Sequence, residues 1–195
     1  MELLSSEKVF SADNQQERLV KIGWITGFVD GEGCFSVNFI KQPDRQEPAR
    51  VRKGYKTGYQ VAHEFAVTQG AKSLESLQLI RDFFGIGNIY LNKRYDNHNE
   101  HLYKYVVRKR SDLVNTIIPF FQRYTLRTAK KESFRIFTDC MNLICEGKHL
   151  TREGAIQVAT MCREINHKKS RTDIISILRN HTSDSLRVNQ FAMRR

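Results

Sequence analysis

The chain has 195 residues, 40% of them hydrophobic, with 32 lysines and arginines against 21 aspartates and glutamates. This composition supports one domain of ordinary size with a real core, and it argues against wholesale disorder. The net charge of +11 favours a polyanionic partner. Apolar runs fall short of the roughly 20 residues of a membrane-spanning helix, and the N-terminus lacks the pattern of a signal peptide.

The four cysteines indicate a reduced protein rather than a metal or disulfide scaffold. None of them forms a CxxC pair, and the six histidines are scattered. This spacing predicts no zinc site. We therefore expect an intracellular protein, in the cytoplasm or an organelle matrix.

The first predicted helix covers residues 11–31. Ser11 or Asp13 could serve as its N-cap, and Asp13 with Gln16 has the spacing of a capping box. Apolar residues at helical spacing predict one buried face. That face comprises Leu19, Ile22, Ile25, Phe28 and Val29.

Two strands follow this helix, separated by a basic segment. Residues 34–40 alternate, with Phe35, Val37 and Phe39 on one side, as in a half-buried strand. Residues 41–60 are rich in Lys and Arg and predict an exposed hairpin or loop. A second strand is predicted at residues 59–69.

The rest of the chain predicts a helix, two strands and several more helices. Gly85 ends the helix at 71–85, and the turn-forming residues 96–99 join strands at 87–95 and 101–110. The remaining predictions are a helix over 111–121 with Ser111 as N-cap and a break at Pro119, helices over 127–147 (closed by Gly147) and 151–170 (N-cap Thr151), and a loose tail over 187–195. The order indicates an α+β fold with one antiparallel sheet.

Three glycines, Gly23, Gly27 and Gly31, recur every fourth residue in the first helix, and Asp30 and Glu32 stand where it ends. A glycine inside a helix costs about 1 kcal/mol against alanine, whereas small residues at this spacing let another backbone approach closely. Two copies of the helix would bring their acidic ends side by side across a two-fold axis. Paired carboxylates there could hold hard divalent cations that act on a phosphodiester.

Residues 24–31, followed by Glu32 and Gly33, resemble the signature of the LAGLIDADG homing endonucleases. Trp24, Ile25 and Thr26 replace the leading residues seen most often in the family. The resemblance implies an αββαββα core with an antiparallel four-stranded DNA-binding sheet and extra C-terminal helices. We assign residues 1–12 to an N-terminal tail, 13–146 to the endonuclease core, and 147–195 to a C-terminal helical extension with a basic tail.

The resemblance also implies functional residues. Glu32 matches the metal-binding acid, Gly31 the position whose carbonyl joins the coordination, and Asp30 a weaker ligand. Gln69 matches a polar residue near the attacking water, and Lys130 the active-site lysine, with Lys131 as the neighbouring alternative. As catalytic residues we therefore expect Glu32, Gln69 and Lys130.

The resemblance places the free face of the sheet in the major groove of double-stranded DNA. Outward polar residues and the basic hairpin supply the expected base and phosphate contacts. The expected DNA-binding residues are Ser36, Asn38, Gln42, Arg45, Arg50, Arg52, Lys53, Lys56, Gln60, Glu64, Lys72, Tyr90, Asn92, Arg94 and Tyr103.

With one motif, the chain resembles the homodimeric branch, and the expected dimer interface is Gly23, Ile22, Thr26 and Gly27. The implied reaction is a metal-dependent staggered double-strand break, with 3′ overhangs, in a long pseudo-palindromic target. Mg²⁺ is the expected cofactor; Mn²⁺ substitutes for it, and Ca²⁺ binds without supporting cleavage. The alternatives are an intron RNA splicing maturase, a non-catalytic DNA-binding protein on the same fold, and an RNA-associated structural protein.

Overall fold

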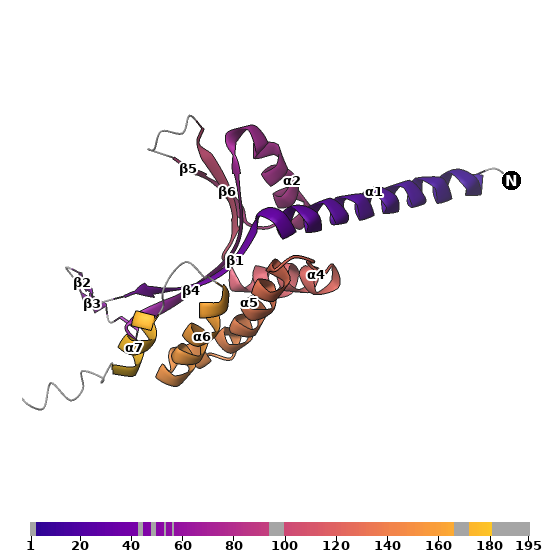
Figure 1. The fold of residues 1–195 in the computed structure, drawn as a ribbon. Coiled ribbons are helices and arrows are strands. Elements are labelled where there is room, and N and C mark those ends of the chain that lie inside the picture. The colour runs from indigo at the N-terminus through magenta and orange to yellow at the C-terminus, as the bar shows by residue number, and fades with distance from the viewer. Residues whose placement is uncertain are drawn as a thin grey trace, which may run out of the picture. The chain divides into compact units, whose positions relative to one another are not determined.

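Helices and strands alternate along the chain in the predicted order (Figure 1). The structure is a computed structural model, and it describes residues 3–42, 45–47, 50–52, 54–55, 57–93, 100–165 and 172–180. The elements are α1 (Leu3–Glu32), β1 (Gly33–Lys41), β2 (Arg45–Glu47), β3 (Arg50–Arg52), β4 (Tyr59–Gly70), η1 (Ala71–Ser73), α2 (Leu74–Phe84), β5 (Asn88–Asn92), β6 (Leu102–Val107), α3 (Arg110–Asp112), η2 (Leu113–Ile117), α4 (Ile118–Arg123), α5 (Lys130–Cys145), η3 (Lys148–Leu150), α6 (Arg152–Ile165) and α7 (Thr172–Asn180). The predicted α+β class is confirmed.

The sheet has four strands in the order β1-β4-β6-β5, and β2 and β3 pair separately as a hairpin within the predicted basic segment. β6 pairs antiparallel with β4 and with β5, so that Thr68 and Tyr90 both lie opposite Lys104. The chain divides into two compact units, which are residues 1–34 with 64–131 and residues 35–63 with 132–195. We call them unit 1 and unit 2.

Unit 1 has an aromatic and aliphatic core between the sheet and its helices. Phe65 on β4 packs edge-on against Phe84, Tyr105 and Phe121. α2 lies along β5 and β6 (Figure 1). It ends where Gly85 takes a left-handed φ of +66°, a conformation that favours glycine. This packing fixes which face of the strands is covered.

Unit 2 has its own core. Phe35 on β1 packs against Phe134 and Phe137 on α5. Helix α6 begins at the predicted N-cap, since the Thr151 hydroxyl accepts the Gly154 N–H at 3.1 Å. α6 and α7 form a small apolar cluster against which Phe39 and Tyr59 pack. The C-terminal helices therefore support β1 and the start of β4.

Two helix predictions are wrong at their ends. α1 begins at Leu3, so Ser11 and Asp13 lie inside it instead of capping it, and residues 3–12 are helical rather than a separate tail. The segment before Ser11 holds no glycine or proline to stop a helix. Ser111 is likewise not the cap of its helix, because Lys109 holds that position and the Ser111 hydroxyl bonds to Asp112.

Pro119 does not break its helix as predicted. It lies at the first positions of α4, directly after the π-helical turn η2. A proline lacks the N–H of a regular helix turn and crowds the carbonyl four residues earlier. The wider π turn before it accommodates the ring, so the helix continues.

None of the helices in the described ranges is long and apolar enough to cross a membrane.

Candidate functional site

The acidic end of α1 is held by the segment that precedes α5. The Asp30 carboxylate accepts hydrogen bonds from the backbone N–H of Arg127 at 2.9 Å and of Thr128 at 3.1 Å. It also accepts the Thr128 hydroxyl at 2.7 Å. Both of its oxygens accept hydrogen bonds. Asp30 thus joins the end of α1 to two residues that lie 97 and 98 positions further along the chain.

These bonds also set the charge of Asp30. Desolvation raises the pKa of its carboxyl, but the hydrogen bonds from Thr128 and Arg127, together with nearby Lys130, outweigh desolvation and hold the pKa below its ordinary value. Asp30 is therefore ionised at neutral pH. The resemblance offered it as a weaker metal ligand, and its hydrogen bonds instead fit a structural anchor.

Lys130, at the start of α5, reaches the same turn. Its Nζ donates to the Gly31 carbonyl at 3.0 Å and also to the Gly33 carbonyl. The position of Gly33 demands glycine, because a Cβ there would lie 2.5 Å from Val29 Cγ1 and 2.7 Å from the Val29 carbonyl oxygen. The sharp change from helix to strand thus aims two carbonyls at one ammonium group.

Glu32 is the last residue of α1 and is exposed. Within the described ranges, its carboxylate makes no hydrogen bond or ion pair, in contrast to Asp30. Glu32 adjoins Gly31, whose carbonyl already accepts a cationic donor. The end of α1 therefore carries an exposed glutamate next in sequence to a glycine whose carbonyl accepts a lysine. The described residues hold no group of three or more His, Cys, Asp or Glu side chains that could bind a metal on their own.

Gln69 lies near the end of β4, where the chain turns into η1. It pairs with Tyr103 across the sheet. The turn is fixed by Glu100, whose carboxylate accepts the Lys72 N–H at 2.7 Å and would lie 2.8 Å from a Cβ added at Gly70. Neither Gln69 nor the exposed side chain of Lys72 bonds to Glu32 or Lys130 within the described part of the chain.

The strand register sorts the predicted DNA-binding residues of unit 1 by face. Glu64, Tyr90 and Asn92 share the parity of Lys104, on the face opposite α2. Tyr103 instead shares the parity of buried Tyr105. The placing of Tyr103 on the open face is therefore wrong, because it follows the core alternation of β6.

The structure also places the expected readers of unit 2. Asn38 is exposed, and Gln42 Nε2 donates to Gln60 Oε1 at 3.1 Å. Ser36 is only 7% exposed, so the expectation that it points outward is wrong. Alternation assigns a residue to one face of a strand and does not predict how much of its side chain is covered. Arg45, Arg50 and Arg52 lie on β2 and β3, while Lys53, Lys56, Arg94 and the tail at 187–195 lie outside the described residues.

Sequence reasoning missed the partners of Glu64. Its Oε1 accepts Lys104 Nζ at 2.5 Å, and its Oε2 accepts Arg108 Nε at 2.9 Å. Desolvation raises the pKa of Glu64, and the two cations outweigh desolvation and hold the pKa below its ordinary value. The alternation of residues 102–108 could have placed Lys104 and Arg108 on the same face.

The glycine-bearing face of α1 is exposed. A Cβ added at Gly23, Gly27 or Gly31 would meet nothing within 4 Å. Exposed apolar side chains, Val20 and Trp24, lie on the same side of the helix. Ile22 is instead 6% exposed, so it belongs to the core of unit 1 rather than to the expected dimer interface. Thr26 is half-buried and donates its hydroxyl to the Ile22 carbonyl.

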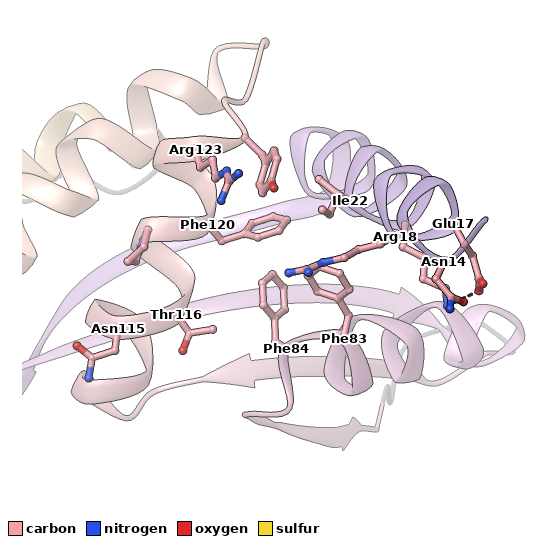
Figure 2. Close-up of a pocket in the computed structure, with 13 residues that line it drawn as sticks. Asn14, Glu17, Arg18, Ile22, Phe83, Phe84, Asn115, Thr116, Phe120 and Arg123 are labelled. Atoms are coloured by element: carbon pink, nitrogen blue, oxygen red, sulfur yellow. Dashed lines mark ion pairs between the residues drawn. The ribbon is translucent and has the colours of Figure 1, made fainter. Parts of the chain in front are cut away.

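A groove of about 730 Å³ opens elsewhere in unit 1, between α1, the end of α2 and the helical segment at 115–124. Figure 2 shows Arg18 pointing from α1 toward the rings of Phe83 and Phe84, with Arg123 and Phe120 on the other side. Among the residues expected at the site or the interface, the groove includes Ile22 alone. It is therefore separate from the acidic end of α1.

Known proteins resemble this chain in sequence and in fold. Residues 25–141 match the family model described as LAGLIDADG endonuclease. The chain is 30% identical, over 149 residues, to "Probable intron-encoded DNA endonuclease 1" of Mycosarcoma maydis. That alignment covers 76% of this chain and 47% of the relative. The chain thus spans about half the length of this relative, and less of several others.

Solved structures give the same result. The homing endonuclease I-TnaI superposes with a TM-score of 0.63 at 32% identity, covering 80% of this chain and 94% of that one. I-SmaMI, bound to an uncleaved DNA target in the presence of calcium ions, superposes with a TM-score of 0.64 at 28% identity. That match covers 82% of this chain and 49% of the I-SmaMI chain. The chain belongs to the LAGLIDADG endonuclease family.

Proposed function

We propose that the chain is a site-specific DNA endonuclease that acts as a homodimer with divalent metal ions. It makes a staggered double-strand break with 3′ overhangs in a long pseudo-palindromic target. The observation that carries this proposal is the end of α1, where exposed Glu32 follows Gly31, whose carbonyl accepts Lys130. Family membership and the net charge of +11 support a DNA substrate.

The residues at this end fit a hard divalent cation. The available donors are oxygens, from the Glu32 carboxylate and the Gly31 carbonyl, and Mg²⁺ prefers one or two carboxylates completed by waters and substrate phosphates. Asp30 would have to give up its bonds to residues 127 and 128 to become a ligand. We therefore assign metal binding to Glu32 and Gly31, and anchoring to Asp30. A bound Mg²⁺ supplies charge at the phosphate and favours ionisation of a water.

The remaining residues position the attacking water and the DNA, and they neutralise charge on the phosphate. The ammonium of Lys130 keeps the turn in shape through two carbonyls, and from there it stabilises charge that develops on the scissile phosphate. Gln69, at the end of β4, orients the attacking water through its amide. The polar strand face and the β2–β3 hairpin bind bases and phosphates along the duplex.

The exposed glycine face of α1 supports the homodimer. Glycines at two interior positions of α1, Gly23 and Gly27, reduce helix stability, and nothing in the described chain occupies the space above them. A second copy of α1 would use that space, and it would set two Glu32 carboxylates beside the two-fold axis. Each copy would cut one strand, which gives the stagger. An intracellular location remains a prediction.

The test is cleavage of duplex DNA that spans the uninterrupted insertion locus, with Mg²⁺, Mn²⁺ or Ca²⁺ as the added ion and both strand ends mapped. We expect a staggered break with Mg²⁺ or Mn²⁺, binding without cleavage in Ca²⁺, and at least a 1,000-fold loss of cleavage in Glu32→Gln with binding kept. Glu75→Gln, at an exposed glutamate in the first turn of α2, is the matched control and should cut normally.

Tight DNA binding without cleavage in any metal would overturn the nuclease and favour the non-catalytic reading. Binding to intron RNA in preference to duplex DNA would favour the maturase. Loss of both binding and cleavage in Glu32→Gln would show that this acid is structural.

A further inference from the structure

On the open face of unit 1, four side chains from β4, β5, β6 and the residue after β6 form a cluster in which one arginine is braced. The cluster comprises Glu64, Tyr90, Lys104 and Arg108, and the strand register places them on the face opposite α2. Glu64 is 18% exposed at its side chain, and it holds one cation on each carboxylate oxygen. The Arg108 side chain is 60% exposed, so it is the outermost charge of this cluster.

The contacts of Arg108 leave the two Nη atoms of its guanidinium available to a ligand. Its Nε donates to Glu64 Oε2 at 2.9 Å, and its guanidinium carbon lies 5.7 Å from the centroid of the Tyr90 ring. Within the described residues, its two Nη atoms donate no hydrogen bond. The guanidinium is therefore braced by a carboxylate and an aromatic ring, while two parallel N–H donors have no partner among the described residues.

Two parallel N–H donors match the O6 and N7 acceptors that guanine presents in the major groove. A free arginine loses rotamer freedom when it makes such a contact, and the two contacts that fix Arg108 reduce that loss. Lys104 offers a point charge without the fork, and Glu64 already holds its ammonium. Among the described residues of this cluster, the geometry singles out Arg108.

We propose that Arg108 reads one guanine in each half-site and that Glu64 is its positioning residue. This inference rests on the proposed function, in which the open strand face binds duplex DNA. It also replaces the expectation that Glu64 contacts DNA, since both of its oxygens are occupied. Tyr90 supports the guanidinium plane and does not read a base.

The experiment is selection of binding sites from a randomised duplex library in Ca²⁺, with the full chain. Four proteins are compared, namely the wild type and the variants Arg108→Lys, Glu64→Gln and Arg81→Lys. Arg81 is the matched control, because it too is an exposed arginine bonded to a carboxylate, Asp82, but on α2. Thermal melts establish that each variant is folded.

We expect the wild type to select one guanine per half-site that Arg108→Lys no longer selects. The loss should be about 5- to 100-fold at that base pair, the range of one bidentate contact. All other positions and the salt dependence should stay the same, because the charge is kept. Glu64→Gln should weaken the same preference, and Arg81→Lys should leave every position unchanged.

An unchanged preference in Arg108→Lys, or a loss spread evenly over the site, would overturn the inference while leaving the endonuclease intact. If Glu64→Gln were unfolded, the Arg108→Lys profile would still decide the guanine contact. A wild type that selects no duplex at any salt concentration would instead overturn the proposed function, and the guanine contact with it.

Discussion

The two faces of α1 differ in burial. One face carries Ile22, Ile25 and Val29, which are buried in unit 1. The other carries Gly23 and Gly27, which are exposed and have open space above them. The first face stabilises the chain by removing apolar area from water. The second face lowers helix propensity, and no packing within the described chain offsets that loss. If α1 pairs with a second copy as proposed, stability and assembly are assigned to separate sides of one helix.

Among these substitutions, Ile25→Ala on the buried face should lower the free energy of unfolding most. Ile25 is 1% exposed, so removing its side chain leaves a cavity and should lower the free energy of unfolding by about 3 kcal/mol. Urea denaturation at one fixed protein concentration measures this. Leu19→Ala is the control, because Leu19 is 57% exposed and its truncation should cost about 0.5 kcal/mol or less. Equal losses in the two variants would contradict the assignment of faces.

Gly27→Leu tests the exposed face. A Cβ added at Gly27 meets no atom within 4 Å inside the described chain, and the substitution should favour the helix by about 1 kcal/mol. The added side chain would nevertheless fill the space that a second α1 needs. We expect sedimentation equilibrium to give the mass of one chain instead of two, with double-strand cleavage lost. Gln78→Leu, at an exposed position of α2, should remain dimeric, and a dimeric Gly27→Leu would refute the proposed packing.

Asp30→Asn tests the end of α1, where the buried and exposed faces of the helix meet the anchoring carboxylate. The substitution weakens the bonds to Arg127 and Thr128 and should cost about 1 kcal/mol at pH 7, a typical value for a capping carboxylate. The pKa of Asp30 is lowered in the folded chain, so its contribution is complete above the ordinary pKa of 3.8 and is lost as pH falls through the folded value.

Denaturation curves at several pH values test this prediction. The difference between the wild type and Asp30→Asn should shrink below about pH 4. Glu32→Gln removes an equal charge two residues away and should leave stability almost unchanged. A pH-independent difference for Asp30→Asn would mean that its charge contributes nothing.

The sequence predicted the parts of the fold that depend on periodicity and on strong local signals. The strands, the helix ends at Gly85 and Gly147, and the Thr151 cap follow from such signals. Periodicity alone placed Leu19 on the buried face, where the structure has it exposed. The side of a helix that is buried depends on its neighbours, which lie far away in sequence.

The candidate site, too, depends on contacts between residues that lie far apart in the sequence. The resemblance identified Glu32, Gly31 and Lys130 by residue type, and the structure joins Lys130 to Gly31. The brace of Arg108 by Glu64 was beyond sequence reasoning, because it depends on the pairing of strands 44 residues apart. Register between distant strands is set by tertiary packing, and no local pattern encodes it.

The link between Asp30 and Thr128 also has a consequence for biosynthesis. A ribosome that has made the whole of α1 has produced every residue of the acidic motif, yet the partners of Asp30 are still about 100 residues away. A chain emerges at roughly 5–20 residues per second, so several seconds separate the motif from the segment that secures it. The acidic end is therefore completed only after β6 and the helical segment at 110–123 have emerged.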